Sequence, residues 1–345
     1  MPDPSPPDLM IEARSLVKRY GTKGRKPKPF TAVAGLDLAV RRGECFGLLG
    51  PNGAGKSTTM RMIACVSKPT EGTLTVLGLD TRTDGPEIRG RIGVVPQEDT
   101  FDMDLTVSEN LRVYGRYFGL SRAQIDAAIV RLLEFAKLED KADERVEALS
   151  GGMRRRLTIA RSLINDPEMV LLDEPTTGLD PQARQVLWER LFQLKKSGVT
   201  LVLTTHYMDE AEQLCDRIVV VDGGLIVDEG SPRELIDRHC TREVLELRYD
   251  SDSGDLAEFA GRVRKVLSGE GGKGGGDGGG GEEGEESSRG ERVEVLPDRL
   301  LCYTEDGEAS LAALVGAALS PAGALVRRST LEDVFLALTG RKLVD

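Results

Sequence analysis

Short apolar runs alternate with amphipathic stretches from residue 9 to about residue 240. Five of these runs predict strands, at 45–49, 92–95, 169–172, 200–204 and 218–221. The last three are nearly continuous in Val, Leu and Ile, which is typical of strands buried on both faces of a parallel sheet. The pattern therefore predicts a sheet that is covered on both sides.

The amphipathic stretches predict helices at 56–66, 106–118, 121–136 and 182–196. Two of these helices open with the residue pairs of a capping box, Thr106 with Glu109 and Ser121 with Gln124. Strands that alternate with helices indicate an α/β fold. The helical run at about 101–165 indicates a helical block inserted into that fold.

The pattern changes after residue 240. It predicts strands at 243–249, 291–295, 299–304 and 323–328, with helices at 256–267 and 310–319. This order, βαββαβ, suits a small ferredoxin-like α+β domain over 241–345. A further helix is predicted at 330–338, with a Ser329/Thr330 cap and an apolar face.

Two segments lack the apolar residues that a core requires. Twelve of the 22 residues at 269–290 are glycine, and most others are Glu, Ser, Asp or Lys. Such a segment buries too little apolar surface to offset its ordering entropy, so we predict a flexible insertion. Residues 1–8, rich in Pro and Asp, are predicted to be a disordered tail.

Composition narrows the class of protein. A net charge of −11 argues against a surface built to grip nucleic acid, and no nucleic-acid partner is expected. The 345 residues contain no run of 18 apolar residues, so no membrane span is predicted. The N-terminal segment lacks the features of a secretory signal. The five cysteines are scattered without a CxxC pair, which favours reduced buried thiols in a cytoplasmic protein.

The segment GPNGAGKST carries the spacing Gly-x-x-x-x-Gly-Lys-Ser between a predicted strand and a predicted helix. Its glycines let backbone N–H groups turn toward phosphate oxygens, and the helix N-terminus adds partial positive charge. Lys56 is predicted to reach the β- and γ-phosphates of a nucleotide, and the Ser57 hydroxyl to ligate Mg²⁺. The predicted nucleotide-binding residues here are Gly50, Pro51, Asn52, Gly53, Ala54, Gly55, Lys56, Ser57 and Thr58.

Two carboxylates, Asp173 and Glu174, end the apolar run at 169–172. Ligands gather at the carboxyl ends of parallel strands, so the pair is predicted to lie beside the phosphate-binding loop. Asp173 is predicted to hold Mg²⁺ or its waters. Glu174 is predicted to polarise the attacking water, as a general base or as an orienting group. A helix N-cap on an ordinary strand end is the alternative, and the loop upstream disfavours it.

A second candidate anion site is LSGGM at 149–153, before an apolar helix predicted at 157–164. Ser150, Gly151 and Gly152 would leave bare backbone N–H groups at a helix N-terminus. Taken alone, a plain loop with an N-cap explains these residues better. The arginines at 154–156 are predicted to form a solvated face, with contact to phosphate or a partner as the weaker alternative. His206 follows the run at 200–204, which favours contact with a γ-phosphate over an ordinary core or surface histidine.

Together these motifs resemble the ATP-binding subunits of ABC transporters over about 9–240. Residues 50–58 match the Walker A motif, 149–153 the signature, 170–174 the Walker B motif and 177–180 the D-loop. The resemblance adds Gln97 as the Q-loop residue, His206 as the switch histidine and Tyr20 as the aromatic residue that stacks on adenine. Met153 stands where many members have Gln. The segment STLEDVFLALTGR resembles the nodulation-factor and daunorubicin-type exporter branch.

The resemblance implies a P-loop NTPase of the ABC type, with the inserted helical subdomain and the C-terminal domain described above. Glu174, His206 and Gln97 are the implied catalytic residues. Ser57, Gln97 and Asp173 are the implied Mg²⁺ ligands, and Asp180 belongs to the implied D-loop. Two subunits are expected to sandwich two ATP molecules, each between the Walker A motif of one chain and the signature (Ser150, Gly151 and Gly152) of the other.

The implied function is the ATPase of a type-2 exporter, peripheral at the cytoplasmic face of the cell membrane. A separate multi-span permease is the expected partner, and a drug, lipid or lipo-oligosaccharide the expected cargo. Two other functions stay open. A soluble ABC protein of translation or DNA maintenance is disfavoured by the single cassette and the absence of long heptad runs. An importer motor is disfavoured by the exporter-like C-terminus and Met153.

Overall fold

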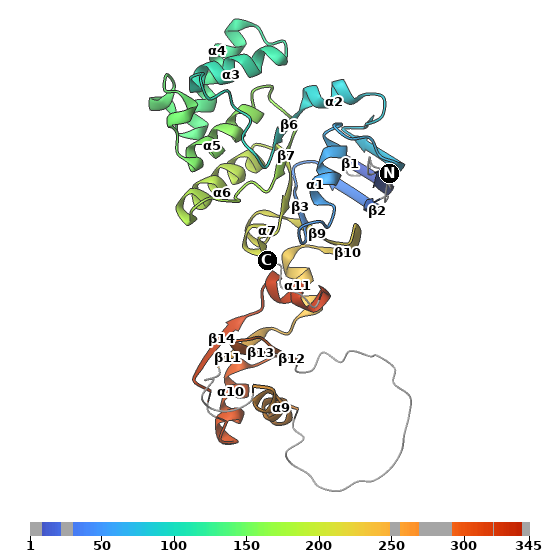
Figure 1. The fold of residues 1–345 in the computed structure, drawn as a ribbon, viewed down its shortest axis with the longest axis vertical. Coiled ribbons are helices and arrows are strands. Elements are labelled where there is room, and N and C mark those ends of the chain that lie inside the picture. Colours follow the sequence, from blue (N-terminus) through green and yellow to red (C-terminus); the bar gives the residue numbers. More distant parts are fainter. Residues whose placement is uncertain (1–8, 22–29, 249–255, 269–291, 320, 340–345) are drawn as a thin grey trace, which may run out of the picture. The chain divides into compact units, whose positions relative to one another are not determined.

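The computed structural model describes residues 9–21, 30–248, 256–268, 292–319 and 321–339 (Figure 1). The chain forms two compact units, Met1–Pro232 and Arg233–Asp345. The predicted tail at 1–8 and the glycine-rich insertion at 269–290 lie outside the described residues. Among the described helices, none combines the length and the apolar character that a membrane span requires.

A six-stranded sheet organises the first unit, in the order β10-β9-β3-β8-β7-β6. Strand β3 pairs in parallel with β8 and β9, β7 with β8, and β6 with β7, while β10 is antiparallel to β9. All five predicted strands are confirmed to within one residue at each end. Their bounds are β3 Cys45–Leu49, β6 Ile92–Val95, β7 Met169–Asp173, β8 Thr200–Thr205, β9 Arg217–Asp222 and, unpredicted, β10 Leu225–Gly230.

A second sheet, β2-β1-β4-β5, is antiparallel and was not predicted. Its strands are β1 Leu9–Tyr20, β2 Phe30–Arg41, β4 Glu71–Val76 and β5 Leu79–Asp80. One buried cluster joins this sheet to the first sheet through α1 (Lys56–Ile63), with Leu36, Phe46, Met62 and Leu171 among its members. The two sheets and α1 therefore share one core.

The segment between β6 and β7 is mainly helical (Figure 1). It contains α3 (Val107–Tyr117), α4 (Arg122–Ala136) and α5 (Gly151–Ser162), which confirms a helical block at this place. Both predicted capping boxes form, at the N-termini of α3 and α4. The remaining helices of this unit are α2 Gly85–Arg91, α6 Pro181–Lys196 and α7 Met208–Leu214.

The second unit has the predicted strand and helix order and a sheet in the order β12-β13-β11-β14. Apolar residues on one sheet face pack with α9 and α10, and those on the other face pack with Leu336 of α11. Helix α10 begins three residues before the predicted 310, because Asp306 caps it by accepting from Ala309 N–H. The bounds are α8 Pro232–His239, β11 Glu243–Arg248, α9 Leu256–Leu267, β12 Val293–Val295, β13 Arg299–Thr304, α10 Gly307–Gly316, β14 Gly323–Arg328 and α11 Leu331–Thr339.

A buried carboxylate fastens α11 to this sheet. Asp333 is fully buried and accepts hydrogen bonds from Arg327 Nη1 and Nη2 at 2.7 and 2.9 Å. It also accepts from the Tyr303 hydroxyl at 3.2 Å and from Thr330 N–H at 2.8 Å. Against the effect of burial, the Arg327 guanidinium and the donors of Thr330 hold the pKa of Asp333 below its ordinary value. The charge is therefore balanced inside the fold.

Candidate functional site

Four strands of the large sheet end at one edge, and each leads into a predicted site segment. Strand β3 leads into residues 50–58, β6 into Gln97, β7 into Asp173 and Glu174, and β8 into His206. The strands are adjacent and parallel, so their carboxyl ends meet. The site is therefore assembled by sheet order from segments far apart in the sequence.

Two glycines of the 50–58 loop are required by their surroundings. A Cβ at Gly50 would lie 2.1 Å from Val221 O, and one at Gly55 would lie 2.4 Å from Ala32 O. Gly55 also has φ of +100°, a conformation that a side chain strains. The loop thus turns tightly over β3 and starts α1 with its N–H groups at the sheet edge.

Lys56 lies inside this loop with only 4% of its side chain exposed. Its Nζ donates to Gly50 O at 2.7 Å and to Pro51 O at 3.1 Å. Burial lowers the pKa of Lys56, while the carboxylates of Glu174 and Asp173 act in the opposite direction. The ammonium is held as a buried cation at the sheet edge.

Ser57 and Asp173 meet across the site. The Ser57 hydroxyl donates to Asp173 Oδ1 at 3.1 Å, and the Thr204 hydroxyl donates to the same oxygen at 2.5 Å. Serine, carboxylate and amide oxygens are ligands that Mg²⁺ accepts. Within the described residues no three His, Cys, Asp or Glu side chains form a metal cluster. Ser57 and Asp173 supply two such oxygens side by side, and Gln97, the third predicted ligand, lines the same cavity as Ser57.

Glu174 contacts three other residues of the site and is 7% exposed. Its Oε2 accepts from Gln97 Nε2 at 3.1 Å and from the Thr177 hydroxyl at 3.2 Å. His206 Nδ1 lies 3.4 Å from Glu174 Oε1 and makes no hydrogen bond in the described chain. The Glu174 backbone has φ of +45°, a strained value for a residue with a side chain. The structure thus brings the three predicted catalytic residues together.

Helix α5 begins at Gly151, six residues earlier than predicted. Ser150 is its N-cap and accepts from Met153 N–H at 3.3 Å, so Gly151 and Gly152 form the first turn. The prediction of a helix from residue 157 was wrong, because local side-chain capping outweighs the low helix propensity of two glycines. Asp180 plays the same structural part for α6, accepting from Ala183 N–H at 2.8 Å.

The prediction that the arginines at 154–156 form a solvated face was wrong for Arg155, which is buried. It is 5% exposed and donates to the carbonyls of both the Gln97 and the Glu174 segments. Arg154 and Arg156 stay partly exposed and donate to Leu149 O and Ala136 O. A run of three arginines gives no sign of which one is buried, so the sequence could not single out Arg155.

A cavity of about 330 Å³ opens over the loop and α1. Phe30, Asn52, Lys56, Gln97 and Glu174 are among the residues that line it. Tyr20, the predicted adenine-stacking residue, is paired with Phe30 across β1 and β2 and is 36% exposed. Phe30 does line the cavity, and sequence reasoning missed it because no motif contains it.

Glu210 is a second residue that sequence reasoning missed. It lies in the first turn of α7, is fully buried, and neither of its carboxyl oxygens has a hydrogen bond of normal geometry in the described chain. Burial raises its pKa to about 7, and the Asp209 carboxylate adds to this. The hydroxyls of Thr205 and Thr176 and the Arg184 guanidinium act in the opposite direction. A buried carboxyl four residues after His206 leaves no signal in the sequence beyond its helical spacing.

The raised pKa of Glu210 leads us to expect that the stability of the folded chain depends on pH. The folded chain holds this proton more tightly than the unfolded chain, so the contribution is present below about pH 4.5 and is lost as the pH rises to about 7. Over that range we expect the free energy of unfolding to fall by up to about 3 kcal/mol more for the native chain than for Glu210→Gln. Urea denaturation at a series of pH values measures the difference, and parallel curves for the two proteins would contradict it.

Comparison with known proteins relates this chain to ABC transporters. A family model described as ABC transporter matches residues 33–177. A second, described as the C-terminal domain of nodulation factor export protein NodI, matches residues 281–340. The chain is therefore similar to an ABC transporter domain in its first part and to a NodI C-terminal domain in its last part.

Relatives that match nearly the whole chain are also ATP-binding proteins of exporters by name. The chain is 46% identical to the Nod factor export ATP-binding protein I of Cupriavidus pinatubonensis, over 97% of this chain and 92% of the relative. It is 46% identical to the protein of the same name from Rhizobium meliloti, over 98% and 90%. A solved dimeric ATP-binding cassette in a post-hydrolysis state, bound to ADP and Pi, matches with a TM-score of 0.59 at 29% identity, over 64% of this chain and 98% of the cassette.

Proposed function

Because the chain belongs to the ATP-binding proteins of ABC transporters, in the group that includes Nod factor export ATP-binding protein I, we propose that it closes as a head-to-tail homodimer around two Mg²⁺-bound ATP molecules. The chain is the ATPase subunit of an exporter. We further propose that it works at the cytoplasmic face of the membrane with a separate multi-span permease. From the names of its relatives, we propose a Nod factor as the cargo.

The observation that carries this proposal is the meeting of Lys56, Ser57, Gln97, Asp173, Glu174 and His206 at one edge of the sheet. Lys56 is a buried cation whose present acceptors are backbone carbonyls, so phosphate oxygens can replace them. When bound, Mg²⁺ would neutralise phosphate charge, held by Ser57, Asp173 and Gln97. The adenine would stack on Tyr20, with Phe30 as the aromatic residue nearer the loop.

In this proposal Glu174 acts on the attacking water. Gln97 and Thr177 donate to one carboxyl oxygen, and His206 lies beside the other, which supports this role. A water near Oε1 would be oriented by the carboxylate, and His206 would contact the γ-phosphate that the water attacks. Asp180, the last residue of the D-loop, would contact the partner subunit.

The signature belongs to the other subunit's ATP in this proposal. Ser150, Gly151 and Gly152 do not line the cavity over the 50–58 loop of their own chain. They form the exposed N-terminal turn of α5, whose backbone N–H groups favour a phosphate. The signature residues are therefore suited to bind phosphate but do not line the nucleotide cavity of their own chain. This supports the proposal that they contact the nucleotide of the partner subunit.

A charge at Gly151 tests the dimer. A Cβ at Gly151 meets no heavy atom within 4 Å, so Gly151→Glu should fold normally. The added carboxylate would face the partner's phosphates, and we expect at least about a hundredfold loss of ATPase activity with little change in single-site ATP binding. Fluorescent-nucleotide titration and a phosphate-release assay measure both. The control is Gly151→Ala, expected to stay within a fewfold of native activity.

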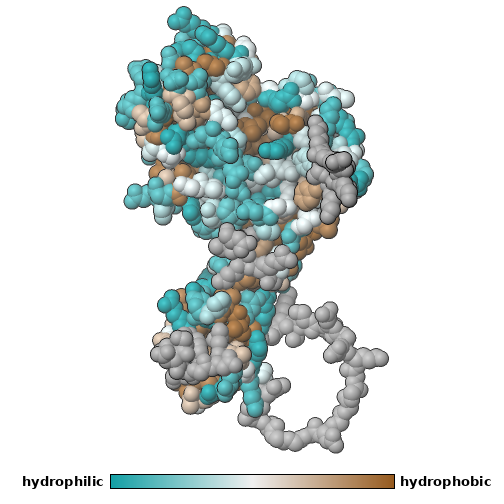
Figure 2. Space-filling view, viewed as in Figure 1, coloured by the Kyte–Doolittle hydropathy of each residue, from teal (hydrophilic) through white to brown (hydrophobic). Residues whose placement is uncertain are grey.

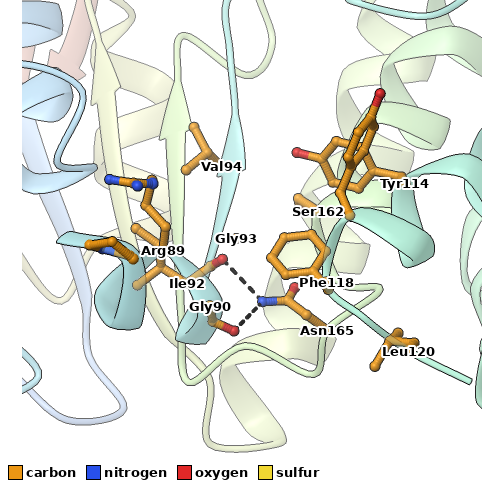
Figure 3. Close-up of a pocket in the computed structure, with 12 residues that line it drawn as sticks. Arg89, Gly90, Ile92, Gly93, Val94, Tyr114, Phe118, Leu120, Ser162 and Asn165 are labelled. Atoms are coloured by element: carbon orange, nitrogen blue, oxygen red, sulfur yellow. Dashed lines mark hydrogen bonds between the residues drawn. The ribbon is translucent and has the colours of Figure 1, made fainter. Parts of the chain in front are cut away.

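A second cavity, of about 540 Å³, is our candidate for permease docking. Its lining includes Ile92, Val94, Tyr114, Phe118 and Leu120, from β6, α3 and the turn after α3 (Figure 3). Apolar side chains gather in the hollow between the helical block and α2 (Figure 2). Asn165 closes one end by donating to Gly90 O and Ile92 O at 2.9 and 3.3 Å. Strand β6 leads from this groove toward Gln97, two residues beyond its end, so a permease segment in the groove would be connected to the nucleotide site by one short segment.

Co-purification tests the exporter assignment. The tagged chain would be recovered from detergent-solubilised native membranes, and co-purifying proteins identified by mass spectrometry. We expect a stoichiometric multi-span permease, lost when Phe118→Asp is introduced into the groove and kept with Tyr20→Ala. Recovery only in the soluble fraction with ribosomal or DNA-bound proteins would contradict the proposal and favour the soluble ABC alternative.

A further inference from the structure

We propose that Arg155 is a positioning residue that links the ATP site of its own subunit to the signature of α5, and so to the second ATP site of the dimer. The inference rests on the proposed head-to-tail dimer. Arg155 lies in the second turn of α5, one turn after the exposed Gly151. Its guanidinium points away from the solvent and into the segments that carry Gln97 and Glu174.

One guanidinium binds two catalytic segments at once. Toward the Gln97 segment, Nη1 donates to Pro96 O at 2.6 Å and to Gln97 O at 3.3 Å. Toward the Glu174 segment, Nε donates to Pro175 O at 2.7 Å, and Nη2 donates to Asp173 O at 3.1 Å and Glu174 O at 3.0 Å. Five carbonyls from two loops therefore share one side chain.

This arrangement transmits displacement because the guanidinium is planar and rigid. Its bonds go to backbone atoms, so they report where the segments lie rather than which side chains they carry. If γ-phosphate binding shifts Gln97 or Glu174, the buried cation must follow or lose bonds that nothing else in the site replaces. A helix carries such a shift along its axis as a unit, and Gly151 is the end of that helix.

The charges around Arg155 keep it a cation. Burial lowers its pKa, while the carboxylates of Asp99, Glu210, Asp173 and Glu174 act in the opposite direction. The guanidinium makes its hydrogen bonds with backbone carbonyls rather than with a carboxylate. It is therefore not half of an ordinary ion pair, and its position is set by the two segments.

The same helix offers a matched control. Arg161 is also 5% exposed, and it donates to Thr100 O and Thr100 Oγ1 at 2.8 Å each. Its guanidinium carbon lies 4.4 Å from the centre of the Phe101 ring. Arg161 thus binds the chain beyond Gln97 but makes no hydrogen bond to residues 173–175 among those described. A Lys at either position keeps the charge and loses the planar fork.

ATPase rate against ATP concentration tests the link in the purified full-length chain. We expect the native chain to show a Hill coefficient clearly above 1, and Arg155→Lys to fall to about 1 with about a tenfold lower kcat. Single-site binding of a fluorescent ATP analogue should change less than twofold, since no 50–58 contact is lost. Arg161→Lys should keep the native Hill coefficient. Native cooperativity and kcat in Arg155→Lys would overturn the inference.

The same measurements distinguish a failure of the proposed dimer from a failure of the Arg155 inference. A native chain with a Hill coefficient of 1 and no ATP-dependent dimer in light scattering would contradict the proposed function, and the inference with it. If Arg155→Lys does not fold, as judged by its thermal unfolding, hydrogen exchange in the Gly151→Glu chain decides. There, without dimer closure, ATP should still slow amide exchange in the first two turns of α5. Slowing confined to residues 50–63 would overturn the inference.

Discussion

Glu174→Gln is expected to bind ATP with native affinity and to lose between about a hundredfold and ten-thousandfold in kcat. The amide keeps the shape of the side chain, and its oxygen still accepts from Gln97 and Thr177, whose donors lie 3.1 and 3.2 Å from Oε2. It removes the negative charge that, in the proposed mechanism, polarises the attacking water. A phosphate-release assay beside a binding titration separates the two effects.

The same variant should accumulate as an ATP-bound dimer, because hydrolysis is the step that reopens the subunits. Size-exclusion chromatography with ATP would then show a dimer, and with ADP a monomer. Native hydrolysis by Glu174→Gln would remove Glu174 from the chemistry and leave His206 and Gln97 as the remaining candidates. A slow enzyme that stays monomeric with ATP would instead contradict the dimer.

Lys56→Ala is expected to weaken ATP binding by at least about a hundredfold, and hydrolysis by a similar or larger factor. Hydrogen bonds between a charged group and its partner contribute about 1.5–3 kcal/mol each, and two phosphates lose theirs together. The present partners of Lys56 are Gly50 O and Pro51 O, which the loop can leave without disrupting the core. The protein should therefore stay folded. Isothermal titration with ATP gives the affinity directly.

Arg61→Ala is the control for that change. Arg61 is an exposed cation in the last turn of the same helix, α1. Its loss should leave ATP affinity within about twofold, because exposed charges at this distance are screened. Equal loss in both variants would mean that net positive charge, rather than the buried ammonium, attracts the nucleotide.

The sequence predicted the parts of the fold that depend on local pattern. The prediction for strand β6, only four residues long, matches the observed bounds because Arg91 and Pro96 flank its apolar run. The helix starts at Thr106 and Ser121 followed from side chains that bond nearby backbone N–H groups. The sheet order then gathered the predicted site residues, which needs only that parallel strands end at the same edge.

The parts that were missed depend on tertiary contacts. Strands β1 and β2 contain exposed and charged positions between the buried ones, and their register shifts break the alternation. Arg155 looks like its exposed neighbours until the fold supplies carbonyls around it. Phe30 reaches the site only because β2 lies over the 50–58 loop. None of these follows from spacing along one segment.

The left-handed backbone at Glu174 has a consequence for engineering and for evolution. Glycine would adopt φ of +45° without that strain, which offsets about 1 kcal/mol of the stability that Glu174→Gly loses with the hydrogen bonds of its carboxylate. A stability screen on this chain would therefore penalise the loss of this carboxylate less than its burial suggests. Selection for activity, rather than for stability, is then what we expect to keep the proposed catalytic carboxylate at position 174.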